Sequence, residues 1–183
     1  MKKYFIGYCL LSAVYSFSSC SSTPKEEATN ERNALIAQVD SLQKKMVNSQ
    51  TMELDKNLAV KGIAAYVDFV AKYPQDSLCA EYLFRASDLS RGVGDNPKSI
   101  DLLKQICQKY PDYNKIPDCI FLQGYYYQEF FKDTNTAKQF YQELLAKYPN
   151  HAFADDAQAL MSTFGKTDEQ MIKEFEERAK TKK

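Results

Sequence analysis

The stretch Leu144–His151, "LLAKYPNH", decides the fold, because its Lys-Tyr-Pro triplet occurs three times in the chain. The copies stand at 72–74, 109–111 and 147–149, so they recur after 37 and 38 residues. A proline disfavours helical angles in the residue before it, and each copy therefore predicts the end of a helix. Such ends at nearly equal spacing predict a structural unit that repeats along the chain.

The residues upstream of each proline also repeat in register. The residue twelve positions before the proline is small, the one eight before it is large, and the one five before it is apolar. The three sets are Gly62, Ser99 and Ala137; Tyr66, Leu103 and Tyr141; and Phe69, Ile106 and Leu144. These offsets lie on one face of a helix, with the small residue where a neighbouring helix must approach closely. A further set of small residues, Ala86, Gly124 and Ser162, predicts a second such helix in each unit.

The pattern predicts helices over 56–73, 77–91, 97–110, 117–131, 134–148, 153–164 and 168–180. The last six are expected to form hairpins in chain order, with 56–73 leading in. Asn96, followed by proline, is expected to cap a helix start, and Thr167 with Gln170 forms a capping box. Gly92 and Gly165 are expected at helix ends that need a left-handed residue.

Two helices per unit of about 34 to 38 residues resemble the tetratricopeptide repeat, over about 57–180. In that family the first helix of a unit carries a large, a small and an aromatic residue, as at Ile120, Gly124 and Tyr127. Arg85 and Gln123 depart from the family, because they stand where leucine is usual. The resemblance implies an all-α, antiparallel helix-hairpin solenoid of about three to four repeats over 56–180, with an N-terminal helix.

Residues 1–19 are expected to be a secretory signal. Lys2 and Lys3 precede an apolar run that is too short to span a bilayer comfortably. The run ends in "FSSC" at 17–20, which resembles the lipobox of bacterial lipoproteins, with Phe17 where leucine is usual. The resemblance implies a lipid on Cys20 and a polar tether over 20–30. It also implies attachment to the outer membrane, facing the periplasm or exposed at the cell surface.

Residues 31–50 are expected to form an N-terminal helix with Leu35, Val39, Leu42 and Met46 along one side. So short an apolar seam does not specify a coiled coil. Two interpretations remain open at this point: the helix folds onto 56–73 and caps the first repeat, or it mediates weak self-association. The order of a coiled coil followed by repeats resembles that of the periplasmic cell-division coordinator.

Composition argues against several classes of function. The chain has 24 basic and 24 acidic residues and no basic stripe, which argues against a nucleic acid partner. The single histidine, His151, lies in an expected turn without a partner at the spacing of a metal site or a catalytic pair. The sequence therefore predicts no catalytic residue, no metal site and no cofactor. Cys79, Cys107 and Cys119 are expected to be buried apolar residues, with a Cys107–Cys119 bridge as the alternative.

Stacked helix pairs create a concave surface lined mainly by the first helix of each pair. The family's groove positions, carried onto this sequence, are Leu83, Ser87, Ser90, Arg91, Phe121, Tyr125, Gln128 and Glu129. Phe121 and Tyr125 lie one helical turn apart and would form an aromatic step that anchors a partner, unless they pack between repeats. The resemblance implies a membrane-anchored adaptor that binds a protein partner in envelope assembly or maintenance, as outer-membrane assembly lipoproteins do. The alternative is a surface lipoprotein that binds glycan or cell wall.

Overall fold

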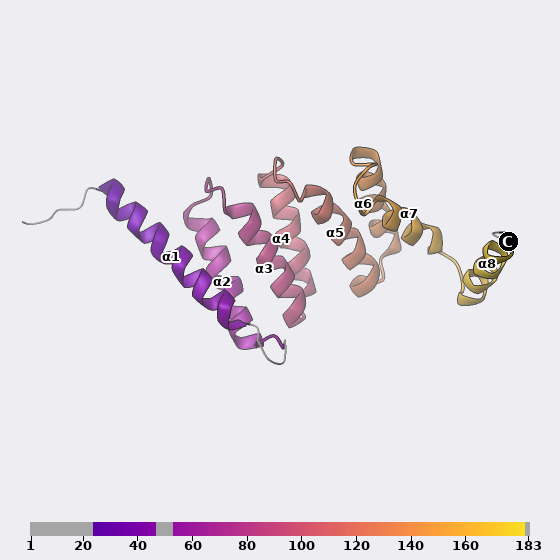
Figure 1. Cartoon of the computed structure of the whole chain (residues 1–183), viewed down its shortest axis with the longest axis horizontal. Coiled ribbons are helices and arrows are strands. Elements are labelled where there is room, and N and C mark those ends of the chain that lie inside the picture. The colour runs from indigo at the N-terminus through magenta and orange to yellow at the C-terminus, as the bar shows by residue number, and fades with distance from the viewer. Residues whose placement is uncertain (1–23, 47–52, 182–183) are drawn as a thin grey trace, which may run out of the picture.

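The computed structural model describes residues 24–46 and 53–181, and all regular structure in this part of the chain is helical (Figure 1). The predicted signal segment and Cys20 lie outside the described residues. The helices are α1 (Pro24–Met46), α2 (Lys56–Lys72), α3 (Cys79–Val93), α4 (Asn96–Lys109), α5 (Ile116–Phe131), α6 (Thr134–Lys147), α7 (Ala154–Thr163) and α8 (Asp168–Thr181). Every helix predicted from 56 onward is present, with each end within two residues of its predicted position.

From α1 to α7 each helix packs on the next, so the hairpins α1–α2, α3–α4 and α5–α6 stack in a row that α7 continues (Figure 1). The predicted all-α helix-hairpin solenoid is therefore confirmed. The core runs through the stack as one chain of contacts, from Val39 in α1 to Ala157 in α7. None of the described helices combines the length and the apolar character that crossing a bilayer would require.

The Lys-Tyr-Pro copies end α2, α4 and α6 with the same backbone geometry. Tyr73, Tyr110 and Tyr148 have φ of −126°, −131° and −136°, and ψ of 59°, 58° and 57°. Each tyrosine N–H donates to the carbonyl four residues earlier, and each tyrosine carbonyl accepts from the N–H three residues later. The repeated triplet therefore repeats one turn, and successive hairpins start in the same orientation.

Aspartates start the second helix of each hairpin. Asp55, Asp95 and Asp133 accept hydrogen bonds from first-turn backbone N–H groups at 3.0, 3.1 and 3.0 Å. These bonds satisfy donors that have no partner within the helix. The sequence predicted Asn96 as the cap of α4, and this prediction is wrong. The cap is Asp95, and Asn96 is the first helical residue.

The predicted helix ends are partly correct. α3 ends on Gly94 at φ 93°, whereas Gly92 lies inside the helix. Gly165 has the predicted left-handed conformation, at φ 77°. The capping box is also confirmed, since the Thr167 N–H donates to Gln170 Oε1 at 3.0 Å and the Gln170 N–H donates to Thr167 Oγ1 at 3.3 Å.

α8 does not form the predicted hairpin with α7. It leaves the stack after the linker 164–167 and makes no substantial contact with another described helix (Figure 1). Eight of its 14 residues are charged, so burial against α7 would desolvate many charges for little apolar gain. Lys166 instead pairs with Glu174 at 2.7 Å, which ties α8 to its own linker.

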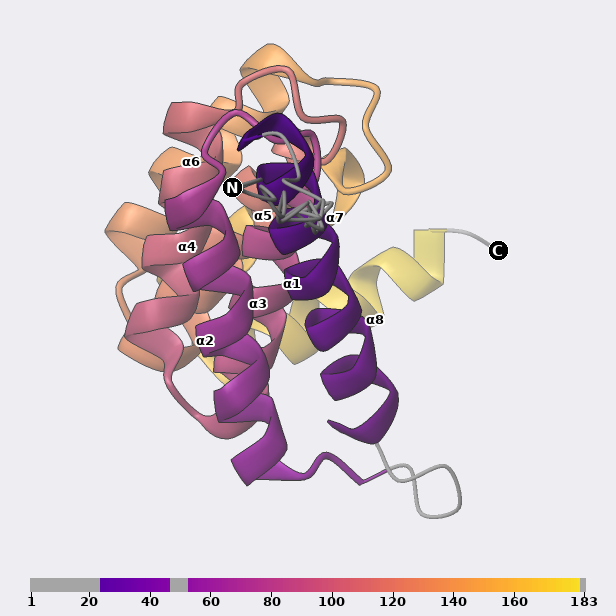
Figure 2. The same cartoon turned by 90° about the vertical axis from the view of Figure 1, so that its left-hand side faces the viewer.

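α1 lies along α2 at the near end of the stack, as Figure 2 shows from that side. Val39 and Met46 are buried, and ion pairs join Arg32 to Asp76 and Glu31 to Lys72. The helix begins at Pro24, inside the segment 20–30 that the sequence predicts as a tether. Glu26 and Glu27 lie in its first turn, where carboxylates favour a helix N-terminus. The part of the predicted helix after Met46 lies outside the described residues.

Candidate binding groove

Three adjoining depressions lie over the first helices of the hairpins. They lie between α1 and α3, between α3 and α5, and between α5 and α7, with volumes of about 260, 300 and 390 Å³. Phe84 and Asp88 line both the first and the second depression, and Leu122 and Tyr125 line both the second and the third. The three depressions therefore form one continuous groove.

The middle depression is mainly aromatic and aliphatic. Phe84, Leu122 and Tyr126 line it, and Tyr125 and Phe130 stand at its surface with exposed fractions of 36% and 44%. Apolar rings that the chain itself leaves exposed in a concave site are the kind of surface that anchors a partner.

The first depression contains a polar cluster, in which the Glu81 carboxylate gathers several donors. Glu81 accepts from the Tyr113 hydroxyl at 2.6 Å, from Arg85 Nε at 2.8 Å and from Lys115 Nζ at 3.0 Å. Burial opposes ionisation of Glu81, but these hydrogen bonds outweigh it and hold its pKa at about 2. Lys115 also lies 4.8 Å from the ring centre of Phe84, so the polar and aromatic parts of the groove adjoin.

Four of the predicted groove residues are buried by the chain itself, and three of them lie in α3. Leu83 and Ser90 are fully buried, and the Ser90 hydroxyl donates to the Ala86 carbonyl at 2.7 Å. The Ser87 hydroxyl lies at the floor of the middle depression and donates to the Ser99 carbonyl at 3.0 Å. These side chains hold α3 in place and offer little surface to a partner.

The sequence left open whether Phe121 and Tyr125 anchor a partner or pack between repeats. Their rings are nearly parallel, with centres 6.3 Å apart. Phe121 is buried and stacks on Phe153 at 4.4 Å, so it packs between repeats, although it also borders the third depression. Tyr125 lines the middle and third depressions and is the more exposed member of the pair.

Of the remaining predicted residues, Arg91 belongs to the groove, and Gln128 and Glu129 lie beside it. Arg91 lines the middle depression, and its guanidinium donates to the Asp88 carboxylate at 2.9 Å. Gln128 accepts from the Tyr141 hydroxyl at 3.1 Å and donates to the Glu129 carboxylate at 3.2 Å. Gln128 and Glu129 do not line the three depressions, so they contribute to the groove at most indirectly.

Several groove residues follow directly after positions predicted from the sequence. Phe84, Asp88 and Leu122 line the groove although the prediction did not name them. Of the predicted residues just before them, Ser87 and Phe121 also line the groove, whereas Leu83 is buried in the core. One residue turns a helix by about 100°, so successive residues lie on different parts of its surface. The small residues Ala86 and Gly124 mark the buried face, and a groove placed opposite them would have included the three missed residues.

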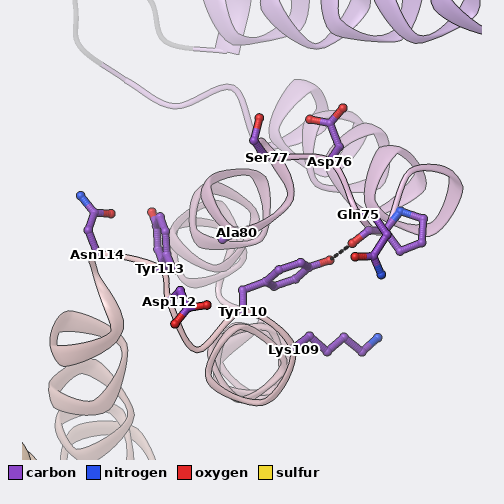
Figure 3. A pocket seen from close by; sticks show the side chains of 10 residues that line it. Gln75, Asp76, Ser77, Ala80, Lys109, Tyr110, Asp112, Tyr113 and Asn114 are labelled. Atoms are coloured by element: carbon purple, nitrogen blue, oxygen red, sulfur yellow. Dashed lines mark hydrogen bonds between the residues drawn. The ribbon is translucent and has the colours of Figure 1, made fainter.

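A larger depression of about 850 Å³ lies outside the groove, between the turns that follow α2 and α4 (Figure 3). The Tyr110 ring crosses it, and the Tyr110 hydroxyl donates to the Pro74 carbonyl at 3.1 Å. Tyr113 on its wall donates to Glu81. Because these hydroxyls bond the turn after α4 to the turn after α2 and to α3, this depression is a junction of the scaffold.

The groups with possible chemistry are dispersed. His151 Nε2 lies 3.6 Å from the Asp118 carboxylate, while Nδ1 accepts from the Phe153 N–H at 3.3 Å. Within residues 24–46 and 53–181, no three histidine, cysteine, aspartate or glutamate side chains gather in a way that could hold a metal ion. Cys79, Cys107 and Cys119 are free thiols.

Comparison with known families identifies one repeat. Residues 118–151, which cover most of α5, all of α6 and the following turn, match the family model described as Tetratricopeptide repeat. A comparison of the chain with curated proteins finds no match. Such repeats usually mediate protein–protein interaction and generally belong to scaffolds that are not enzymes.

Proposed function

We propose that the chain is a lipid-anchored adaptor of a bacterial envelope, which holds a segment of a partner protein in its groove. The observation that carries the proposal is the continuity of the groove across α1, α3, α5 and α7, with aromatic side chains left exposed at its centre. The repeat match supports binding to protein.

The groove favours apolar anchoring over charge recognition. Its central charges, Asp88 and Arg91, are exposed and already pair with each other, and exposed ion pairs contribute little free energy. Tyr125 and Phe130 are exposed, and together with Leu122 they offer apolar surface to the middle depression. We therefore expect the bound segment to insert apolar side chains into the middle and third depressions.

Two adjacent phenylalanines provide a matched test of the groove. Phe130 lines the middle depression and Phe131 does not, although their exposed fractions are 44% and 45%. Photo-cross-linking from intact envelopes, followed by mass spectrometry, should lose its main protein adduct with Phe130→Ala and keep it with Phe131→Ala. Circular dichroism should show equal helix content in the two variants.

Equal adduct yields from the two variants would remove this groove as the binding surface. Selective loss of binding to isolated glycan, without any protein adduct, would favour the glycan-binding alternative.

The anchor rests on the sequence pattern that ends in Cys20. Acyl chains contribute about 0.8 kcal/mol for each buried methylene, so the two or three chains typical of bacterial lipoproteins hold a protein on a membrane durably. Cys20→Ala should move the chain from the membrane pellet to the soluble fraction, whereas Cys79→Ala should leave it in the pellet. A membrane-bound Cys20→Ala variant would contradict the anchor.

A further inference from the structure

The contact between α4 and α5 contains two thiols. Cys107 lies near the end of α4 and Cys119 in the first turn of α5, and these two helices pack on each other. The Gln123 side-chain nitrogen donates both to Cys107 Sγ, at 3.6 Å, and to the Cys119 carbonyl, at 3.0 Å. One nitrogen therefore bridges the two residues across the helix contact.

The two thiols differ in access. Cys119 is fully buried, whereas Cys107 is only partly buried. A hydrogen bond between their side chains lowers the pKa of the Cys107 thiol and, together with burial, raises that of Cys119. Cys107 is therefore the thiol that reaches the reactive thiolate form and meets a reagent first.

We propose that Cys107 and Cys119 are a redox site, at which an oxidised thiol compound forms a reversible disulfide that ties α4 to α5. The Cys107 thiolate attacks the disulfide of the oxidant, forms a mixed disulfide and releases one thiol. The Cys119 thiol then loses its proton, attacks Cys107 Sγ and releases the second thiol. The protein gives up two electrons and two protons, and the oxidant is reduced to two thiols.

The bridge would link the α3–α4 hairpin to the α5–α6 hairpin. It closes a loop of about a dozen residues through the turn between α4 and α5, which restricts the unfolded chain more than the folded one. It also fixes the step from α4 to the helix that carries Tyr125. This inference does not depend on what the groove binds.

Cys79 provides the matched control. It is buried like Cys119, but its thiol donates to the Tyr73 carbonyl at 2.9 Å, and no second cysteine lies beside it among the described residues. Oxidation that is specific to the Cys107–Cys119 site should leave Cys79 a thiol.

The full chain in detergent should be treated with oxidised glutathione under native conditions, alkylated and digested with trypsin. Cleavage after Lys109 and Lys115 separates the two cysteines, so the bridge appears as peptides 105–109 and 116–132 joined with the loss of two hydrogens. Peptide 73–85, with Cys79, should be alkylated. Oxidation should raise the melting temperature by about 5 to 10 °C, and dithiothreitol should reverse the rise.

Single variants test the order of the steps. Cys119→Ser should stop at a glutathione adduct on Cys107, and Cys107→Ser should leave Cys119 unmodified. The proposal is overturned if the joined peptides form only after the chain is unfolded, or if Cys107 in the native chain retains glutathione while Cys119 is intact.

Discussion

A single carboxylate, that of Glu81, joins α3 to the turn that precedes α5. Tyr113 and Lys115, which donate to it, belong to that turn, and Arg85 lies one helical turn along α3. Arg85 also donates to Gln43 of α1 at 2.6 Å. Arg85, which stands where the tetratricopeptide pattern usually has leucine, therefore extends this hydrogen-bond network to a third segment of the chain.

The pKa of about 2 makes Glu81 a source of pH-dependent stability. Its folded pKa lies below the unfolded value of about 4.3, so the stabilisation is complete above that value and is lost as the pH falls toward 2. Glu81→Gln should lower the melting temperature at pH 7 by about 2 to 4 °C, or about 1 kcal/mol after discounting for partial exposure.

The difference between Glu81→Gln and the wild type should close between pH 4.5 and pH 2 in calorimetric scans. Glu143→Gln, which removes an exposed ion pair with Lys147, serves as the control and should change the melting temperature little. A difference that persists unchanged at pH 2 would contradict the assignment.

At the scale of the helix, the distance to which two neighbouring helices can approach each other depends on the small residues that recur in the repeats. A β-carbon on Gly124 would meet the buried Tyr141 ring at 2.8 Å, whereas one on Gly62 would meet the flexible end of Met46 at 2.6 Å. A packed ring cannot move away, but a methionine terminus can change its rotamer. The two glycines therefore occupy similar positions in the sequence pattern, but they differ in how well they tolerate a larger side chain.

Gly124→Ala should destabilise the fold by about 1 to 3 kcal/mol, because it overpacks the contact between α5 and α6. Gly62→Ala should be nearly neutral, since the gain in helix propensity of about 1 kcal/mol offsets the displacement of Met46. Urea denaturation followed by circular dichroism compares the two. Equal losses of unfolding free energy in the two variants would show that the contact with Tyr141 does not determine the cost of the substitution.

The sequence predicted helices better than it predicted their surroundings. Apolar periodicity and the Lys-Tyr-Pro ends located each helix after 56, since both are local signals. Four of the eight predicted groove residues line the groove, whereas Phe84, Asp88 and Leu122 were not predicted, because a shift of one residue around α3 or α5 moves a side chain between core and surface. The small residue Ser162 suggested a partner helix for α7, yet Ser162 is exposed, because the charge of α8 opposes packing.

At the scale of the whole molecule, the two ends of the stack differ. α1 covers the near end, while α7 is the last packed helix at the far end and α8 stands apart. In a solenoid each unit depends on its neighbours for burial. Stability is therefore expected to depend on α7 and not on α8.

Deletion of 168–183 should leave the melting temperature within about 2 °C of the full chain. Deletion of 153–183 should lower it well beyond that, because Phe153 stacks on Phe121 and Ala157 is fully buried. Differential scanning fluorimetry distinguishes the two truncations. A large loss from the shorter deletion would show that α8 packs on the stack in solution.

The ion pairs that hold α1 on α2 and the α2–α3 turn have a mechanical consequence. A force applied between α1 and a partner in the groove would act on the packing of α1 against α2, where Val39 and Met46 are buried and ion pairs of Arg32 and Lys72 add to the contact. α8, which makes no substantial contact with another described helix, lies outside the path of that force and would carry none of it.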